Sequence, residues 1–153
     1  MTIPVELNTD QDQTDLPENL SPLQVVAGVV RCGGKIMVAR RASGKHLAGF
    51  WEFPGGKIEA GELAEQSLAR ELMEEFGIHV KVGEKIGSRV HDYPSRTIEL
   101  HAFWAETEAE CAPGDSHDAV AWIAPDELHQ YHFAEADLFL LPLIITSHAA
   151  PGP

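Results

Sequence analysis

The spacing of apolar and polar residues changes along this chain from a strand-like pattern to a helical one and back. The nearly continuous apolar run at 23–31 is typical of a strand that is buried on both faces, and a second run at 35–41 predicts another strand. Gly33 and Gly34 separate the two runs, which predicts a tight hairpin turn. Pro54 and the glycines after it limit the next extended piece to a few residues. The predicted strand segments are 23–31, 35–41, 51–56, 79–93, 96–106 and 119–124.

The pattern becomes helical from Leu63. At about 100° per residue, the apolar side chains after this position fall on one arc of a helix and three glutamates fall on another. Gly77 stands where a helix ends in a left-handed conformation. The apolar arc contains Leu68, Ala69, Leu72, Met73 and Phe76, and the acidic arc contains Glu71, Glu74 and Glu75.

Two further helices are predicted near the C-terminus. Pro125 suits the first turn of a short helix at 125–131, and 137–148 is apolar enough for a closing helix that Pro142 would kink or restrict. These segments, without internal repeats, predict a mixed β-sheet with helices on its faces, which is an α/β or an α+β sandwich. The length of 153 residues suits one domain.

The composition changes at both ends of the chain, which predicts the domain boundaries. Residues 1–20 contain five acidic residues, no lysine or arginine and no apolar period, so we expect a disordered segment. We expect the folded domain at 21–148 and a frayed end at 149–153.

The formal net charge of −13 argues against sequence-independent binding to nucleic acid or to anionic membranes. No run is long and apolar enough to cross a membrane, and no export signal is evident, so the sequence predicts a cytoplasmic protein. Cys32 and Cys111 form no motif, and we expect thiols rather than a disulfide.

The acidic arc of the central helix is the strongest sign of chemistry. Residues three and four apart meet on one helix face, so Glu71 faces both Glu74 and Glu75. Two carboxylates about 4 Å apart repel each other by roughly 1 kcal/mol in water. A solvated acidic face would carry interleaved cations, but the only basic residue in this helix is Arg70. Hard divalent cations among the oxygens would remove the repulsion, so the spacing predicts a metal site.

The segment GGKIEAGELAEQSLARELMEEFGI resembles the Nudix box at every fixed position. The matching residues are Gly56, Glu62, Arg70, Glu71, Leu72, Glu74, Glu75, Gly77 and Ile78. From about residue 23 to residue 143 the chain is similar to MutT-type nucleoside triphosphate pyrophosphohydrolases. The resemblance implies a Nudix α/β/α sandwich with the box as a loop–helix–loop.

The resemblance also implies roles for the residues of the box. Glu74 and Glu75, with the Gly56 carbonyl, would ligate the essential Mg²⁺ or Mn²⁺. Glu71 would bind the metal, or orient and deprotonate the attacking water. Arg70 and Glu62 would pair and hold the loop of the box against its helix.

Outside the box, the resemblance implies that Arg41 contacts the phosphates and that Arg96 lies beside the base. It implies that Phe53 lines the base pocket and that Asp137 reads the base. From the residues alone, Arg41 and Arg96 could be solvated strand ends, and Phe53 could pack in the core. Asp137 could instead cap the closing helix.

The chain departs from the family pattern at one loop position. Similar enzymes carry another glutamate, which binds metal or acts as the general base, about six residues before the tryptophan of the last strand, where this chain has Ser116. Asp115, His117 and Asp118 are the candidates to replace it, and the sequence does not choose among them.

The resemblance implies hydrolysis of a (d)NTP to (d)NMP and pyrophosphate, with 8-oxo-dGTP as the leading substrate and nucleotide-pool sanitation as the role. The alternatives are CTP or a methylated dCTP, then ADP-ribose or an RNA 5′-triphosphate. A catalytically inactive nucleotide-binding module is a further alternative, although such modules commonly lose box glutamates. The sequence leaves the preferred base and sugar, and the oligomeric state, open.

Overall fold

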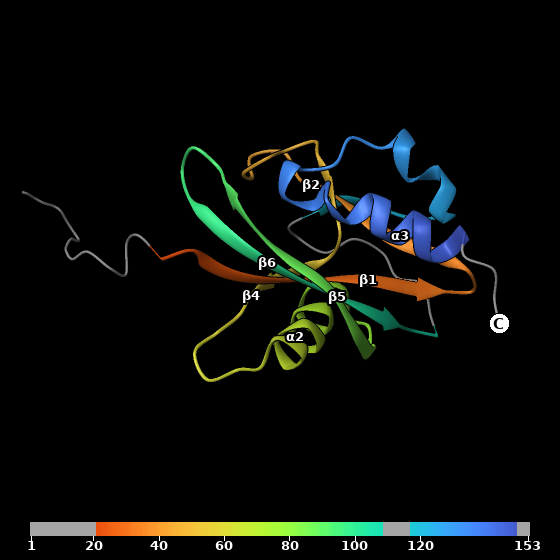
Figure 1. Ribbon diagram of the computed structural model, residues 1–153, viewed down its shortest axis with the longest axis horizontal. Coiled ribbons are helices and arrows are strands. Elements are labelled where there is room, and N and C mark those ends of the chain that lie inside the picture. The colour runs from red at the N-terminus through yellow and green to blue at the C-terminus, as the bar shows by residue number, and fades with distance from the viewer. Residues whose placement is uncertain (1–20, 109–116, 150–153) are drawn as a thin grey trace, which may run out of the picture.

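A mixed β-sheet lies between two helical layers in the computed structural model, which describes residues 21–108 and 117–149 (Figure 1). The strand order is β3-β2-β1-β6-β5, with β4 paired to β1 and β7 paired to β2. β1 and β6 run parallel, and the other pairings are antiparallel. The predicted α/β sandwich is therefore confirmed. The strands are β1 (Leu23–Cys32), β2 (Lys35–Arg41), β3 (Trp51–Glu52), β4 (Gly55–Lys57), β5 (Lys81–Asp92), β6 (Thr97–Glu106) and β7 (His117–Ile123).

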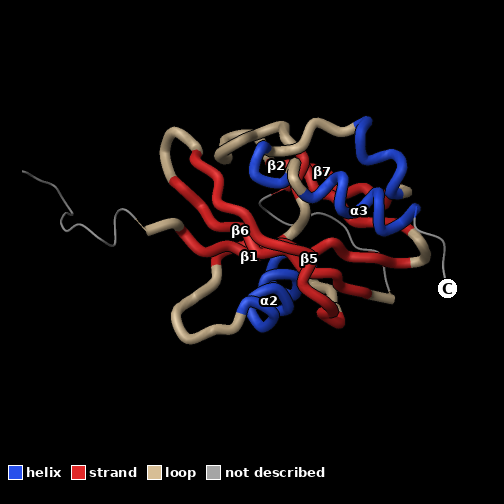
Figure 2. The backbone as a smooth tube through the Cα atoms, in the orientation of Figure 1, coloured by secondary structure: helices blue, strands red, loops and turns tan. Residues whose placement is uncertain are grey.

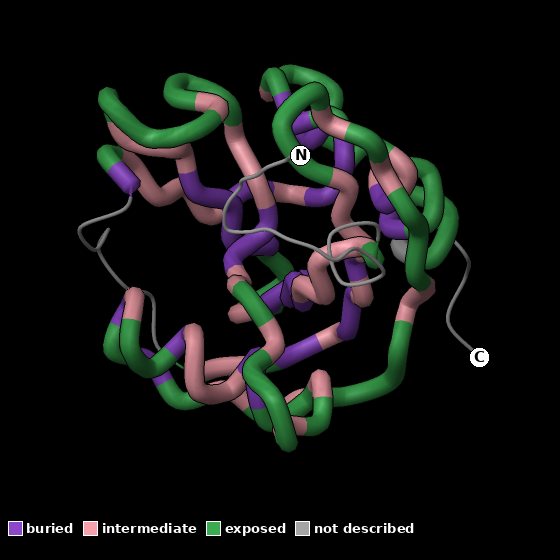
Figure 3. Tube along the Cα trace, turned by 90° about the vertical axis from the view of Figure 1, so that its left-hand side faces the viewer, coloured by how far each residue is buried: buried purple, intermediate pink, exposed green. Residues whose placement is uncertain are grey.

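Each face of the sheet has its own helix and its own apolar core (Figures 1 and 2). The helix α2 (Ala64–Phe76) covers one face, where Leu68 and Leu72 are fully buried against β1, β2 and β6. The opposite face is covered by α3 (Leu140–Ala149) and the 3₁₀ turn η1 (Pro125–Gln130). Buried stretches lie in the interior of the molecule and exposed stretches lie around its outside (Figure 3).

The helix α2 forms where the apolar period predicts it. It ends at Gly77, which has the left-handed φ of 69° that glycine adopts without strain. At its start, the Gln66 side-chain oxygen accepts a hydrogen bond from the Leu63 backbone N–H at 3.0 Å. Met73 differs from the prediction, because it lies at the edge of the apolar arc and its side chain is exposed.

A close approach between two backbones fixes the entry to α2. β4 runs antiparallel to β1, with Ala27 opposite Gly55 and Val26 opposite Gly56. A Cβ atom on Gly55 would lie 1.8 Å from the Val26 carbonyl oxygen, so only glycine fits this position. Gly55 therefore holds the loop of the box directly against the central strand.

The C-terminal elements depart from the prediction in their boundaries. A short 3₁₀ turn, η2 (Glu135–Asp137), precedes α3, so the closing helix begins at Leu140 rather than at residue 137. Pro142 then falls in the first turn of α3, where a helix needs no backbone N–H donor, and the expected disruption is absent. β7 begins at His117, two residues before the predicted strand.

The expected terminal segments lie almost wholly outside the described residues. The predicted disorder of residues 1–20 concerns residues that are not described, as does the predicted fraying of residues 150–153, whereas α3 continues through Ala149. Cys32 is a half-buried free thiol, and Cys111 is not among the described residues. Within the described ranges, no helix combines the length and the hydropathy that crossing a membrane requires.

Candidate active site

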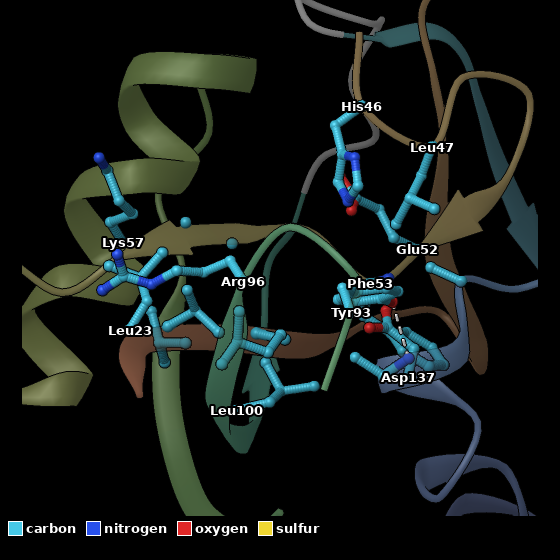
Figure 4. A pocket seen from close by; sticks show the side chains of 18 of the residues that line it. Leu23, His46, Leu47, Glu52, Phe53, Lys57, Tyr93, Arg96, Leu100 and Asp137 are labelled. Carbon is cyan, nitrogen blue, oxygen red and sulfur yellow. Dashed lines mark hydrogen bonds between the residues drawn. The ribbon is translucent and has the colours of Figure 1, made fainter. Parts of the chain in front are cut away.

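The predicted substrate-binding residues all line one cavity of about 340 Å³. Arg41, Phe53, Arg96 and Asp137 come from four separate segments of the chain, and the Gly56 backbone completes the wall beside α2. In Figure 4, Arg96 lies on the side of Lys57 and Leu23, whereas Phe53, Tyr93 and Asp137 gather on the opposite side. Lys57 and Arg96 therefore line one end of the cavity, and aromatic and acidic side chains line the other.

Asp137 and Phe53 form the floor of this second end. The Phe53 backbone N–H donates a hydrogen bond to the Asp137 carboxyl oxygen Oδ2 at 2.8 Å (Figure 4). The Phe53 ring is buried in the core and stacks on Phe133 with a centroid distance of 5.0 Å. Phe53 is thus both a core residue and a cavity residue, and the two readings of the sequence are compatible.

Asp137 is not a helix cap, so that alternative is wrong. It is only 7% exposed and lies at the end of η2, and α3 begins three residues later. Burial raises the pKa of its carboxyl group to about 8, with a smaller contribution from the negative charge of Glu52. At neutral pH the Asp137 carboxyl group is therefore predominantly protonated, and it can both donate and accept a hydrogen bond.

Arg41 is held at the edge of the cavity. Its Nε donates to the His46 backbone carbonyl at 3.1 Å, and its Nη1 lies 3.6 Å from Oε2 of Glu52. The Arg41 and Glu52 side chains are each 24% exposed. Arg41 is therefore a directed cation that faces the cavity and not a freely solvated strand end. Arg96 sits in the tight turn between β5 and β6, and it is exposed to solvent.

The acidic arc of α2 begins against the loop of the box. The Glu71 carboxylate covers the Gly56 backbone so closely that a Cβ atom on Gly56 would lie within 2.6 Å of three carboxyl atoms. The Glu71 side chain is 16% exposed, and burial, opposed by the Arg70 charge, raises its pKa above the ordinary value. Glu74 is more open, with a side chain that is 59% exposed, and Glu75 is half-buried.

Arg70 links the two ends of the box. Its Nε and Nη2 donate to the two carboxyl oxygens of Glu62 at 2.7 and 3.1 Å, and Nη2 also donates to the Lys57 carbonyl at 3.3 Å. Its Nη1 donates to Glu71 at 3.3 Å and to Glu74 at 3.1 Å. This one guanidinium group thus ties the loop to α2 and offsets part of the repulsion within the acidic arc.

The comparisons with known proteins agree with this geometry. The sequence model of the NUDIX domain family matches residues 25–142. The chain belongs to the Nudix family. Over 128 residues, which are 84% of this chain and 95% of the relative, it is 39% identical to a CTP pyrophosphohydrolase of Escherichia coli. It is also 41% identical over 98 residues to an 8-oxo-dGTP diphosphatase of the same organism, covering 61% of this chain and 73% of that protein.

A solved structure shows the same Nudix fold. The solution structure of the Escherichia coli protein ORF135 superimposes with a TM-score of 0.75 at 36% sequence identity. The match covers 89% of this chain and 97% of the other. The Nudix family accounts for the sandwich, for the position of the box between β4 and β5, and for the resemblance noted in the sequence.

The glutamates expected to hold the metal lie on α2, where Glu71 covers the Gly56 backbone. In residues 21–108 and 117–149, no group of three or more acidic, histidine or cysteine side chains is arranged to hold a metal ion. Nη1 of Arg70 donates hydrogen bonds to both Glu71 and Glu74, so these two carboxylates are paired with a cation in this structure. The assignment of Gly56, Glu71, Glu74 and Glu75 as ligands therefore stays a prediction.

The position of Ser116, with its neighbour Asp115, lies outside the described residues. Of the other two candidates for the missing glutamate, Asp118 accepts a hydrogen bond from Nε of Arg40 at 2.7 Å, and both side chains are exposed. His117 is buried, and its Nε2 lies 2.7 Å from Oε2 of Glu52. Between these two, His117 is the residue in contact with the cavity wall.

Several residues of the Nudix cavity were not singled out from the sequence, among them Lys57, Glu52 and Tyr93. Glu52 contacts Arg41 and His117 and lies close enough to Asp137 to raise its pKa. The Tyr93 hydroxyl accepts a hydrogen bond from the Ala136 N–H at 2.9 Å, which fixes η2, and burial raises the pKa of Tyr93. Glu52 adjoins Phe53, and Tyr93 stands three residues before Arg96, so proximity to expected substrate-binding residues was the available signal.

The Glu62–Arg70 pair should make the stability of the folded protein depend on pH in the acidic range. The Arg70 hydrogen bonds, followed by the Glu59 N–H, hold the pKa of Glu62 at about 2 against an ordinary value of 4.5. A lowered carboxyl pKa stabilises the folded state above pH 4.5, and this contribution is lost as the pH falls towards 2. We expect Glu62→Gln to have a lower urea midpoint than the wild type at pH 6, and the two curves to converge near pH 2.

Urea unfolding of the metal-free protein at several pH values measures this difference. Glu59→Gln is the matched control, since Glu59 is 67% exposed and its carboxylate is 3.8 Å from Arg70. A constant difference between Glu62→Gln and the wild type across this pH range would contradict the assignment.

Proposed function

We propose that the protein is a divalent-metal-dependent nucleoside triphosphate pyrophosphohydrolase that forms a nucleoside monophosphate and pyrophosphate, with 8-oxo-dGTP as the leading substrate. One observation carries the proposal. A single cavity joins three cationic side chains, Arg41, Lys57 and Arg96, to a buried carboxyl group that can meet a base edge, Asp137. Its wall includes the Gly56 backbone, beneath the first glutamate of the α2 acidic arc.

The residues of the box suit Mg²⁺ or Mn²⁺. Carboxylate and backbone carbonyl oxygens are hard donors, and Gly56 leaves room for a carboxylate directly above its backbone. Glu71, Glu74 and Glu75, with the Gly56 carbonyl, would hold the cation. When bound, the cation would neutralise phosphate charge and lower the pKa of coordinated water. The exposed Glu74 can leave Arg70 without unpacking α2, because its side chain is 59% exposed.

The side chains of the protein supply positioning and charge. Three cations of the cavity offset the negative charge of a triphosphate, namely Arg41, Lys57 and Arg96. Such charge neutralisation drives phosphoryl transfer more than covalent chemistry does. Glu71 is the candidate to orient the attacking water and take its proton, since its carboxylate lies directly against the Gly56 backbone in the cavity wall. Water oxygen bonds to the β-phosphorus, and the bridging oxygen leaves with the nucleoside monophosphate.

A second substrate, CTP, is favoured by the protonation of Asp137. A protonated carboxyl group presents one donor and one acceptor side by side, which matches the N3 acceptor and the N4 amino group of cytosine. It also matches the O6 acceptor and the N7–H of 8-oxoguanine. The relatives named for CTP and for 8-oxo-dGTP hydrolysis accord with both candidates.

Pyrophosphate release from a nucleotide panel tests the proposed function. With Mg²⁺, we expect kcat/KM of at least about 10⁴ M⁻¹ s⁻¹ for 8-oxo-dGTP or CTP, a value within the ordinary range for enzymes. ADP-ribose and an RNA 5′-triphosphate should be poorer substrates by at least about tenfold, which is 1.4 kcal/mol of transition-state binding. Binding of nucleotides without any turnover would instead identify an inactive nucleotide-binding module.

Hydrolysis in ¹⁸O-labelled water locates the bond that breaks. Attack at the β-phosphorus places the label in pyrophosphate, and this is the expected result. A label in the nucleoside monophosphate would mean attack at the α-phosphorus and would refute this part of the proposal.

A further inference from the structure

Three side chains from three strands form a chain of contacts that ends at the cavity. Nε2 of His117 lies 2.7 Å from Oε2 of Glu52, and the same oxygen lies 3.6 Å from Nη1 of Arg41. Because a carboxylate only accepts hydrogen bonds, Nε2 of His117 is the donor. Glu52 and Arg41 line the cavity, whereas His117 stands behind them.

An irregularity in strand pairing brings these side chains together. β2 and β7 pair in regular register from Ile36 to Arg40, and the register then shifts so that Arg41 lies opposite His117. Asp118 is the extra residue of β7. Its carboxylate accepts a hydrogen bond from Nε of Arg40, the residue before Arg41 in β2. A β-bulge redirects side chains in this way. Without the shift, Arg41 would face Asp118 rather than His117.

His117 is fixed by its surroundings. Its side chain is 3% exposed, and its ring stacks on Phe76 of α2 with a centroid distance of 5.2 Å and an interplanar angle of 30°. The His117 imidazole therefore has little freedom to turn. From the start of β7, and packed against the last turn of α2, it presents a rigid donor to Glu52.

We propose that His117 is a positioning residue for substrate binding: it fixes the Glu52 carboxylate, which in turn directs the Arg41 guanidinium towards the triphosphate. Nε of Arg41 donates to the His46 carbonyl, and Nη1 faces the Glu52 carboxylate. The position of Glu52 therefore sets the direction of the Nη1 side of the guanidinium group. Holding a long side chain in its binding geometry lowers the entropic cost of binding. The inference rests on the proposed function, because it assumes a triphosphate in the cavity.

Two substitutions at His117 separate positioning from packing. His117→Phe keeps an aromatic ring against Phe76 but removes the donor, whereas His117→Gln keeps an amide donor at the level of Nε2. For the best nucleoside triphosphate, we expect His117→Phe to raise KM about fivefold with little change in kcat, the signature of lost uniform binding. His117→Gln should restore most of KM.

Arg40→Gln is the matched control, because it breaks the exposed Arg40–Asp118 pair on adjacent positions of the same strands. It should leave KM unchanged. In the His117→Phe/Glu52→Gln double variant, KM should rise no further than in Glu52→Gln alone, since the two residues act through one contact. The ¹⁵N resonance of Arg41 Nε in the nucleotide-free protein gives a readout that needs no turnover, and His117→Phe should broaden or shift it.

The outcomes distinguish this inference from the proposed function. A wild type that hydrolyses no nucleotide on the panel refutes the proposed function, while the Arg41 resonance still tests the contact chain. An active wild type whose KM is unaffected by His117→Phe refutes the positioning role. A fall in kcat at unchanged KM, or a His117→Gln variant that folds but behaves as His117→Phe does, also refutes it.

Discussion

Replacing Glu75 with glutamine is expected to lower kcat by roughly two to four orders of magnitude with Mg²⁺, because a bound cation contributes several kcal/mol of charge stabilisation in the transition state. Glutamine has nearly the same shape as glutamate but cannot supply a charged oxygen ligand. Glu75 is half-buried on the same arc of α2 as Glu71, four residues away. The predicted loss is therefore chemical and not a consequence of misfolding.

The stability of the metal-free Glu75→Gln variant tests whether the loss of kcat arises from misfolding. Like charges four residues apart on a helix destabilise it by about 0.2–0.5 kcal/mol, so removing one of them should leave the melting temperature unchanged or slightly higher. Glu74→Gln should not share this gain, because Glu74 accepts a hydrogen bond from Arg70 at 3.1 Å. Differential scanning calorimetry with and without Mg²⁺ measures both effects, and Mg²⁺ should stabilise the wild type more than either variant.

Glu65→Gln is the control for the loss of one negative charge on the same helix. Glu65 lies in the first turn of α2 and is exposed. Its activity should stay close to that of the wild type. Near-normal turnover in Glu75→Gln would show that this glutamate is not a metal ligand, and equal losses in Glu65→Gln and Glu75→Gln would point to net charge instead.

The order of elements could be predicted from the sequence because local signals agree with the tertiary fold. The apolar period of α2, its glycine cap and the Gly33-Gly34 hairpin each act over a few residues, and the structure contains all of them. The start of α3 could not be predicted in this way. Its position depends on η2, which is held in place by the Tyr93 hydroxyl, a residue 43 positions before Ala136.

The residues of the candidate site also differ in whether a local sequence pattern predicts them. The box is a contiguous pattern, so its glutamates and the Glu62–Arg70 pair could be named from spacing and resemblance. The contact between Arg70 and Glu74 is an i,i+4 pair that helix spacing predicts, whereas the contact between the adjacent residues Arg70 and Glu71 has no such signal. The bulge that brings Arg41 opposite His117 is a long-range pairing feature with no local signal.

Asp137 shows the limit most clearly. As an ordinary ionised carboxylate it would only accept hydrogen bonds, and would favour a base edge rich in donors. Burial reverses this expectation, because the charged form loses its hydration and meets the nearby charge of Glu52. The pKa of about 8 depends on packing between segments far apart in the chain, which no local pattern reports.

The pKa of Asp137 predicts that base preference changes with pH. The Asp137 carboxyl group loses its proton, and with it the hydrogen-bond donor, as the pH rises through about 8. The quantity kcat/KM follows this change, because its pH dependence reports the ionisation of groups in the free enzyme. The cytosine edge needs that donor, whereas guanine-type bases also offer the donor-only N1–H and N2 amino edge. The ratio of kcat/KM for 8-oxo-dGTP to that for CTP should therefore rise about tenfold between pH 7 and 9. A tenfold change corresponds to about 1.4 kcal/mol, which is the contribution of one hydrogen bond.

Asp137→Asn is the sharpest test of this ionisation, because an amide keeps one donor and one acceptor at every pH. We expect the variant to retain kcat/KM within about threefold of the wild type at pH 7, well below the cost of one lost hydrogen bond. The ratio of 8-oxo-dGTP to CTP should no longer depend on pH. Asp137→Ala should reduce discrimination among 8-oxo-dGTP, dGTP, CTP and dCTP at all pH values.

The stability of the same variants checks the ionisation without any substrate. A raised carboxyl pKa stabilises the folded state below the ordinary value of 3.8, and this contribution is lost as the pH rises through about 8. The wild type should therefore lose several kcal/mol of unfolding free energy between about pH 4 and pH 8 that Asp137→Asn does not lose. Parallel stability curves for the two proteins, or a base preference that varies equally with pH in both, would mean that Asp137 is ionised at neutral pH and reads the base only as an acceptor.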